Sequence, residues 1–185
     1  MNERMLEIKE VLDKVYNWET ELLNDIYAED LIDITIDWFK HYQWDEDSKK
    51  MMDLYEKLID EEWNETVNAW RNKDIVEVLD WICDYVWVTT WYIYFWHKNV
   101  EEKDRVEERD LVRNAARQLV LRSAWAFIPF DLFKVAYLEV AYSNWTKSLE
   151  KRKEDDPEWK VWKVIKWENF VKPDLNRVFD LFANK

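Results

Sequence analysis

The sequence predicts an all-α protein, a helical bundle with an antiparallel core helix pair carrying an acidic metal site. The first observation is that apolar residues recur with the helical period of about 3.6 along most of the 185 residues. The second is that two long helical segments are joined only by the short polar turn at residues 71–73. Helices with so short a connection pack as antiparallel neighbours.

The N-terminal part is expected to form two amphipathic helices, one over residues 4–27 and one over residues 30–42. A polar break at residues 44–47 follows, and Ser48 is a plausible N-cap for the next helix. We therefore divide the chain into an N-terminal helical extension, residues 1–47, and a main all-α domain, residues 48–185, that ends in a loop and tail.

The core pair is predicted over residues 49–69 and from Asp74, the expected cap of the second helix, to about Trp96. Aromatic residues make the end of that second helix a thick apolar rod, which indicates core or a subunit interface. A charge run at residues 100–113 precedes another helical pattern. Pro129 interrupts this pattern, and a new helix is expected from about Phe130 to Tyr142.

The composition excludes several classes of protein. A net charge of -13 without a basic stretch argues against nucleic-acid polymers as partners. The single Cys83 rules out an internal disulfide framework, fits a reducing, cytoplasmic interior, and is expected to be a small core residue. The N-terminus lacks the apolar run of a signal peptide, and the apolar run at residues 86–96 is too short to cross a membrane.

Glycine is absent, whereas average usage of about 7% would give roughly 13 residues, and there are 14 tryptophans. Trp70, Trp162 and Trp167 stand where a chain ordinarily has glycine. Two interpretations remain open. Either the protein is truly rich in tryptophan, or a stop codon used for glycine in the source is translated here as tryptophan. A glycine mass at Trp162 or Trp167 in the source organism's protein would decide for recoding.

Six carboxylates are distributed over the two core helices. On the first helix they lie at spacings of three and four residues, and on the second at spacings of three, four and seven, so each set shares one side. Packing the helices together would gather the six into one patch, where repulsion would be severe without a cation. Oxygen ligands without interleaved Cys or His suit Mg²⁺ or Mn²⁺. The alternative is that these are solvated faces of acidic helices. The candidate metal ligands are Glu61, Glu62, Glu65, Glu77, Asp80 and Asp84.

This pattern, Glu-Glu-x-x-Glu followed by Glu-x-x-Asp on the next helix, resembles the metal-binding signature of the all-α nucleoside triphosphate pyrophosphohydrolases, the MazG-like and phosphoribosyl-ATP pyrophosphohydrolase-like superfamily. Residues 74–88 in particular resemble the second core helix of its phage and bacterial branch. Either Asp80 or Asp84 could be the terminal aspartate of the signature, and both are kept. The resemblance implies a homodimer or homotetramer.

The C-terminal part resembles the same branch through Glu139-Val140, Ser143-Asn144, Lys147, Lys163-Val164, Lys166 and Pro173-Asp174. Asn144 and Lys147 are a donor and a cation three residues apart, suited to phosphate oxygens or a base edge. Lys163 and Lys166 could add countercharge if their segment folds over the site. The simpler interpretation of each lysine alone is an exposed side chain. The candidate substrate-binding residues are Asn144, Lys147, Lys163 and Lys166.

The favoured hypothesis is Mg²⁺- or Mn²⁺-dependent hydrolysis of a nucleoside triphosphate, in particular a deoxynucleotide, to monophosphate and pyrophosphate. Glu62 is the candidate catalytic residue, taking a proton from the attacking water. One alternative is phosphoribosyl-ATP hydrolysis, which the same superfamily performs. The other, from a different class, is a non-catalytic acidic helical scaffold or binding protein.

Overall fold

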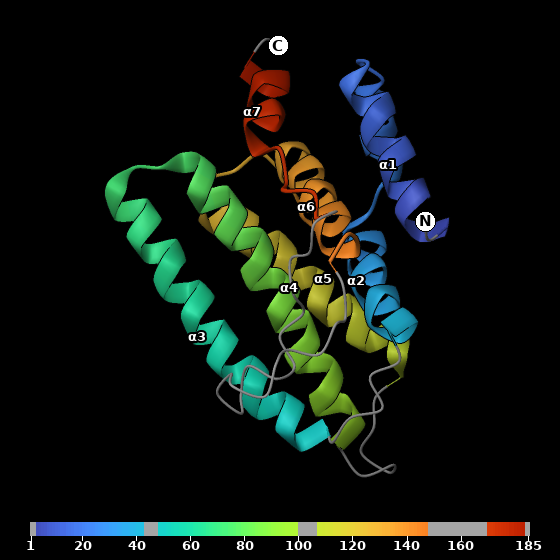
Figure 1. Cartoon of the computed structure of the whole chain (residues 1–185), viewed down its shortest axis with the longest axis vertical. Helices are drawn as coiled ribbons and strands as arrows, with labels where there is room; N and C mark the ends of the chain where they lie inside the picture. Colours follow the sequence, from blue (N-terminus) through green and yellow to red (C-terminus); the bar gives the residue numbers. More distant parts are fainter. Residues whose placement is uncertain (1–2, 43–47, 100–106, 148–169, 184–185) are drawn as a thin grey trace.

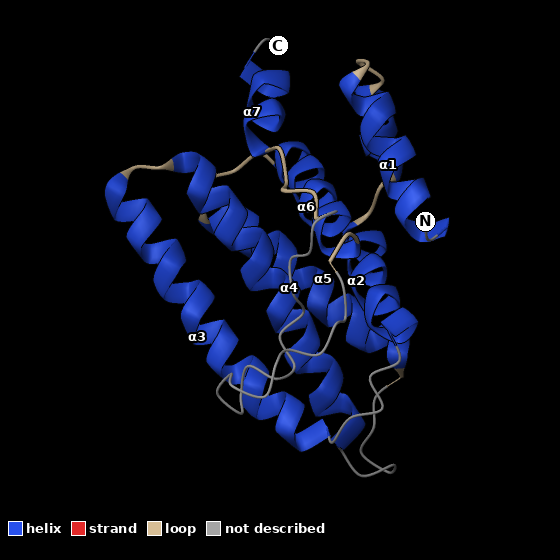
Figure 2. Ribbon diagram, in the orientation of Figure 1, coloured by secondary structure: helices blue, strands red, loops and turns tan. Residues whose placement is uncertain are grey.

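The structure is a computed structural model that describes residues 3–42, 48–99, 107–147 and 170–183. Within these ranges every regular element is helical, and the predicted all-α class is confirmed (Figure 2). The elements are α1 (Glu3–Tyr16), the 3-10 helix η1 (Thr20–Asp25), α2 (Ala28–Tyr42), α3 (Ser48–Asn72), α4 (Ile75–Asn99), α5 (Glu108–Trp125), α6 (Phe130–Trp145) and α7 (Leu175–Ala183).

The predicted core pair is the hairpin of α3 and α4, which run antiparallel along each other (Figure 1). The turn between them begins at Lys73, whose φ is 57°, and the Glu77 amide donates to Asp74 Oδ1 at 3.2 Å. That hydrogen bond confirms Asp74 as the cap of α4. The first core helix extends three residues beyond its predicted end at Ala69, because the chain turns only at Lys73.

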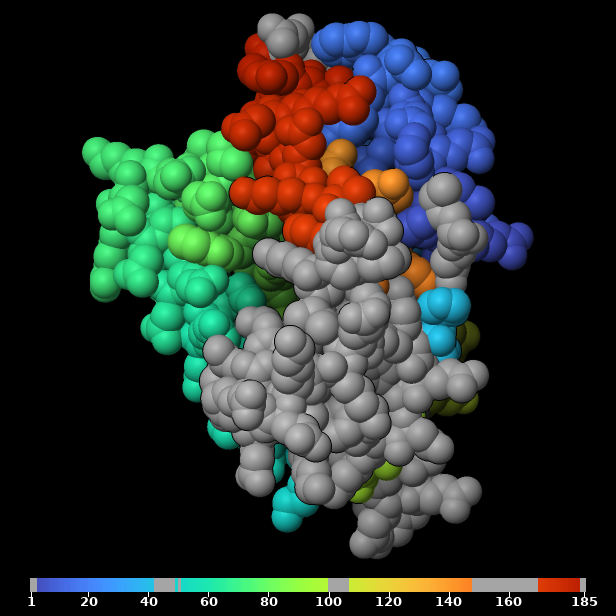
Figure 3. Space-filling view, in the orientation of Figure 1, coloured from blue at the N-terminus to red at the C-terminus, as the bar shows by residue number. Residues whose placement is uncertain are grey.

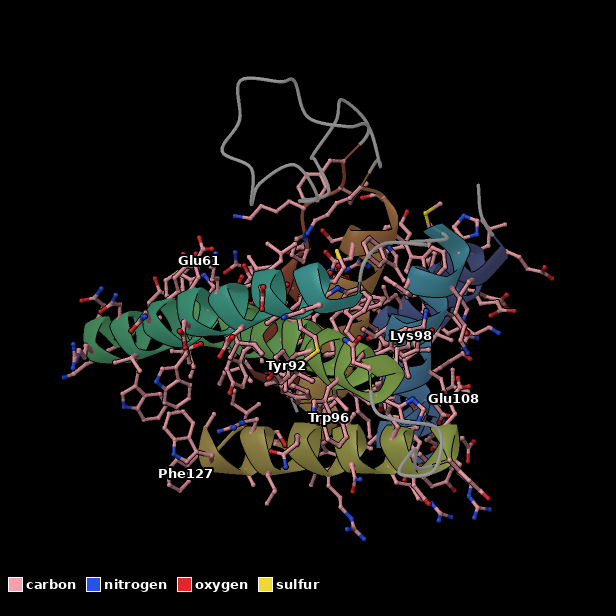
Figure 4. The ribbon with its side chains drawn as sticks, turned by 90° about the horizontal axis from the view of Figure 1, so that it is seen from below. Glu61, Tyr92, Trp96, Lys98, Glu108 and Phe127 are labelled. Atoms are coloured by element: carbon pink, nitrogen blue, oxygen red, sulfur yellow. The ribbon has the colours of Figure 1, made fainter. Side chains whose placement is uncertain are left out.

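Helix α4 is the centre of the bundle, in contact with α2, α3, α5, α6 and α7. Its aromatic residues confirm the expected core: Trp91 and Phe95 are almost fully buried, and both rings pack on Phe39 of α2, at centroid distances of 4.4 and 5.0 Å. Aromatic pairs at such distances add to the free energy gained by burial alone. Trp96, by contrast, is half exposed on the side of α4 that faces α5 (Figure 4).

The single long helix predicted over residues 4–27 is wrong. Helix α1 ends at Tyr16, and η1 and α2 follow after a turn centred on Trp18. The Glu19 amide donates to the Lys14 carbonyl at 3.1 Å and the Trp18 amide to the Val15 carbonyl at 3.0 Å. This pair of bonds is a Schellman motif, in which the residue after the helix takes a left-handed conformation. Trp18 takes that conformation, with φ of 72°.

Two further helices end in the same way, α3 at Lys73 and α5 at Phe127, both with φ of 57°. Glycine is the usual residue in this position because a Cβ atom is crowded there. In this chain tryptophan, lysine and phenylalanine hold the three positions. Trp70 lies inside α3 and not at the end of that helix, where glycine is usual. Trp162 and Trp167 lie outside the described residues.

Pro129 separates α5 from α6, as predicted, and α6 is buried along almost its whole length. Helix α7 was not predicted. It packs on α6 and α4, and lies against α1 at one end of the molecule (Figure 3). The buried Glu139 carboxylate links these parts: it accepts from the Tyr16 hydroxyl at 2.7 Å and from the Asp174 amide at 3.2 Å. Arg177 of α7 also lies over the Tyr16 ring, 3.8 Å from its centroid.

One hydrophobic cluster includes buried residues from Ile8 in α1 to Leu181 in α7. The helices of the N-terminal extension therefore share a core with those of the main domain. Among the described residues, no helix is both long and apolar enough to cross a membrane.

Candidate active site

Four of the residues singled out in the sequence line a pocket of about 110 Å³. They are Glu62 from α3, Asp84 from α4, Asn144 from α6 and Lys147 just after it. The remaining walls are apolar or aromatic. These walls come from Trp38, Leu54, Tyr55, Leu58, Trp87 and Val88.

Glu62 interrupts the buried stripe of α3. The stripe runs through Leu54, Leu58, Thr66 and Ala69, all buried, and Glu62 takes the position between Leu58 and Thr66. The Thr66 hydroxyl donates to the Glu62 carbonyl oxygen at 2.8 Å, which satisfies the hydroxyl within the helix. A carboxylate in an otherwise apolar stripe is unfavourable for stability alone and therefore indicates a functional position.

Asp84 faces the pocket from α4, and Asp80 lies one turn earlier on the same helix. Burial and, to a smaller extent, the negative charges of Asp84 and Glu77 together raise the pKa of Asp80 to about 6, whereas the positive charges of Lys172 and Lys147 oppose the shift. Three carboxylates and two lysines therefore share one electrostatic environment. Such crowding of like charge favours a cation at this end of the pocket.

Asn144 is held by its backbone. The Trp38 indole Nε1 of α2 donates to the Asn144 carbonyl oxygen at 3.0 Å, and the Lys147 amide donates to the same oxygen at 3.1 Å. The residue is 3% exposed. Its Nδ2 has no hydrogen-bond acceptor within the described part of the chain. A buried donor beside a pocket is therefore available to a ligand.

The structure does not place the other candidate residues discussed below at this pocket. Glu61 is exposed on α3 and points away from α4 (Figure 4), because neighbouring residues of a helix are about 100° apart and cannot face one partner together. Glu65 and Glu77 are half-buried and do not line this pocket. Lys163 and Lys166 lie outside the described residues.

The donors suit a hard divalent cation, because Glu62 and Asp84 offer carboxylate oxygens from facing helices. Across the four described ranges, no three His, Cys, Asp or Glu residues converge closely enough to form a ready-made metal site. Mg²⁺ commonly binds proteins through only one or two carboxylates, completing its shell with water and substrate phosphates. The residues present therefore fit a cation that binds together with a phosphate ligand.

Lys172 was missed by the sequence reasoning. It precedes Pro173 and Asp174, whose Oδ1 caps α7 by accepting from the Arg177 amide at 3.1 Å. Helix α7 contacts α4, and the positive charge of Lys172, just before this helix, lies near enough to Asp80 to lower its pKa. The signal in the sequence was the Pro-Asp pair before an amphipathic segment, a typical helix start.

Fold and pocket together define an all-α bundle with a small pocket that is lined by aromatic, aliphatic and carboxylate side chains. The chain matches no family model. No curated protein and no solved structure matches it either. The function of the protein is therefore inferred from the pocket and from the resemblance seen in the sequence.

Proposed function

We propose that this protein is a metal-dependent nucleoside triphosphate pyrophosphohydrolase that acts on deoxynucleotides and releases the monophosphate and pyrophosphate. One observation carries the proposal. Glu62, Asp84, Asn144 and Lys147, chosen from two distant stretches of the sequence, line a single pocket. The four side chains supply oxygen ligands, a hydrogen-bond donor and a cation, which are the groups that a nucleotide and its metal ion require.

Glu62 and Asp84 would hold Mg²⁺ or Mn²⁺, with Asp80, Glu65 and Glu77 further along the same helices. The ion would neutralise charge on the phosphate oxygens and acidify a bound water. Lys147 and Lys172 add positive charge beside these carboxylates and would orient the phosphates. Glu62 is the candidate base, since a half-buried carboxylate at the pocket can accept a proton from water.

The antiparallel hairpin of α3 and α4 suggests how the nucleotide would be oriented along these helices. From the apolar wall at Val88, helix α4 passes Asp84 and then Asp80 before it reaches Glu77 near its start. The eleven steps along the helix from Val88 to Glu77 cover about 16 Å at a rise of about 1.5 Å per residue. The base would lie at the apolar end and the phosphates along the acidic end.

A cytoplasmic location and a homodimer or homotetramer belong to the same proposal. Nucleoside triphosphates are cytoplasmic substrates, and the buried free thiol of Cys83 suits a reducing compartment. The aromatic side chains exposed at the ends of α3 and α5, Trp70 and Trp125, offer a surface for a second copy.

The test is pyrophosphate release from the eight common NTPs and dNTPs and from phosphoribosyl-ATP, with and without Mg²⁺. We expect Mg²⁺-dependent turnover of at least one dNTP, and its loss in Glu62→Gln and Asp84→Asn. Glu56→Gln, an exposed carboxylate on α3, is the matched control and should keep full activity.

Two results would replace the proposal by one of its alternatives. Turnover of phosphoribosyl-ATP alone would assign the sister activity. An absence of turnover, together with an unchanged melting temperature on addition of Mg²⁺ and nucleotide, would favour the scaffold, because a ligand that binds the folded state raises that temperature.

A further inference from the structure

The pocket has more apolar wall than phosphate chemistry requires. Leu58 of α3 and Val88 of α4 lie one turn away from Glu62 and Asp84, and Trp38 and Trp87 line the same pocket. The two indole rings meet edge to face, with centroids 5.8 Å apart. An aromatic and aliphatic surface offers no charge or hydrogen bond to a triphosphate, but it packs well against a flat ring.

The size of the pocket limits that ring. Its volume is about 110 Å³. For comparison, an engineered apolar cavity of about 150 Å³ takes up benzene, and pockets for whole drug-sized ligands have volumes of roughly 300–1,000 Å³. This pocket therefore has room for at most one ring, with the rest of a ligand outside it, and a fused two-ring base would have to project from its mouth.

The buried donor of Asn144 adds chemistry to this size limit. Asn144 Nδ2 has no acceptor among the described side chains and backbone groups, and the residue lines the pocket. The indole of Trp38 fixes the backbone at this point by its bond to the Asn144 carbonyl. A buried donor without an acceptor is unfavourable unless a ligand supplies one. Every pyrimidine base carries a ring carbonyl oxygen that can do so.

We propose that this pocket is a base site that admits a pyrimidine and excludes a purine, and that Asn144 determines this specificity by donating a hydrogen bond from Nδ2 to a ring carbonyl oxygen. The inference rests on the proposed function for the triphosphate, whereas recognition of the base needs neither metal nor hydrolysis.

Binding is measured first, by calorimetry with the deoxynucleoside monophosphates dCMP, dUMP, dTMP, dAMP and dGMP without added metal. The phosphate is the same in all five, so differences in affinity report on the base. We expect the pyrimidines to bind at least about tenfold more tightly than the purines, as shape and hydrogen-bond discrimination of this kind gives. The corresponding dNTPs in the pyrophosphate assay should show the same order in kcat/KM.

Asn144→Ala should lower pyrimidine affinity about tenfold and leave purine affinity unchanged. It should not lower the stability to urea, because the side-chain nitrogen has no partner in the described structure and the Trp38 bond is to the backbone. Asn64→Ala is the control, since that carboxamide bonds to the Asp60 carbonyl of its own helix. Leu58→Ala enlarges the pocket and should raise purine affinity relative to pyrimidine.

The outcomes separate the two proposals. Hydrolysis of purine and pyrimidine dNTPs with equal kcat/KM would overturn the base site and leave the pyrophosphohydrolase standing. Selective binding of pyrimidine monophosphates without hydrolysis of any dNTP would overturn the enzyme and leave the base site. A loss of stability in Asn144→Ala with unchanged base preference would show that Asn144 is structural, which also overturns the inference.

Discussion

Replacing Asp80 by asparagine should stabilise the protein at neutral pH. Burial and the charges of Asp84 and Glu77 raise the pKa of Asp80 from 3.8 to about 6. A shift of two units corresponds to about 3 kcal/mol at about 1.36 kcal/mol per unit, and relaxation and solvent around a partly exposed group reduce it to about 1–2 kcal/mol. Asp80→Asn keeps the shape and removes the charge, so it should raise the free energy of unfolding by about that amount at pH 7.

The pH determines whether the Asp80 carboxyl stabilises or destabilises the folded protein. A carboxyl whose folded pKa lies above its unfolded value binds its proton more tightly in the folded state. Its favourable contribution is complete below about pH 4 and is lost as the pH rises through about 6. Wild type and Asp80→Asn should therefore be equally stable near pH 4 and diverge between pH 4 and pH 7. Urea unfolding across this range, followed by circular dichroism, measures the difference.

Magnesium ions should make wild type more stable than Asp80→Asn at pH 7. If the carboxylates beside Asp80 bind Mg²⁺, the ion stabilises wild type by about 2.7 kcal/mol at 100 times its dissociation constant. Asp80→Asn should lose most of that gain. Asp53→Asn, an exposed carboxylate on α3, controls for the general effect of one charge in an acidic protein. A lower stability of Asp80→Asn than of wild type at pH 7 without metal, or a difference in stability that persists at pH 4, would contradict this prediction.

Three further changes test the fold. Trp18→Gly should stabilise the protein by about 1–2 kcal/mol in urea unfolding, because Trp18 has φ of 72°, whereas Trp96→Gly, inside α4 and also half exposed, should destabilise it by about 1 kcal/mol. A loss of stability in Trp18→Gly would contradict this. Tyr16→Phe removes the hydroxyl bound to Glu139 and should cost about 1.5–3 kcal/mol, with faster hydrogen exchange in α7, whereas Tyr27→Phe, on an exposed ring, should change neither. Asp74→Ala removes the cap of α4 and should lower the urea midpoint by an amount equivalent to about 1 kcal/mol. An unchanged midpoint would show that the cap does not stabilise the protein.

The helices were predictable where the apolar period met a clear boundary residue. Asp74 and Pro129 are such residues, and α4 and α6 begin next to them as expected. The end of α1 was missed because its left-handed residue is Trp18, which carries none of the turn signal of glycine. Helix α7 was missed because its docking depends on the contact of Asp174 with Glu139, 35 residues away.

The sequence located part of the candidate pocket but could not decide which of the acidic residues line it. The spacing of the acids identified Glu62 and Asp84, which meet at one pocket. The same spacing could not separate Glu62 from Glu61, since only the packing of α3 on α4 decides which of two neighbours faces inward. The Pro-Asp pair after Lys172 marks the start of α7, but it does not show that α7 packs against α4, and this packing places Lys172 near the acids.

The hydrogen bond from the Val171 amide to Thr146 Oγ1, at 3.0 Å, brings together two points of the chain that are 25 positions apart. Since the helices on either side are already tied at this point, a two-residue linker could join Lys147 to Phe170 without separating α6 from α7. Such a shortened chain would remove Lys163 and Lys166 in one step, and its turnover would reveal what they contribute. The same junction is a natural place to graft a fluorescent or affinity module onto the bundle.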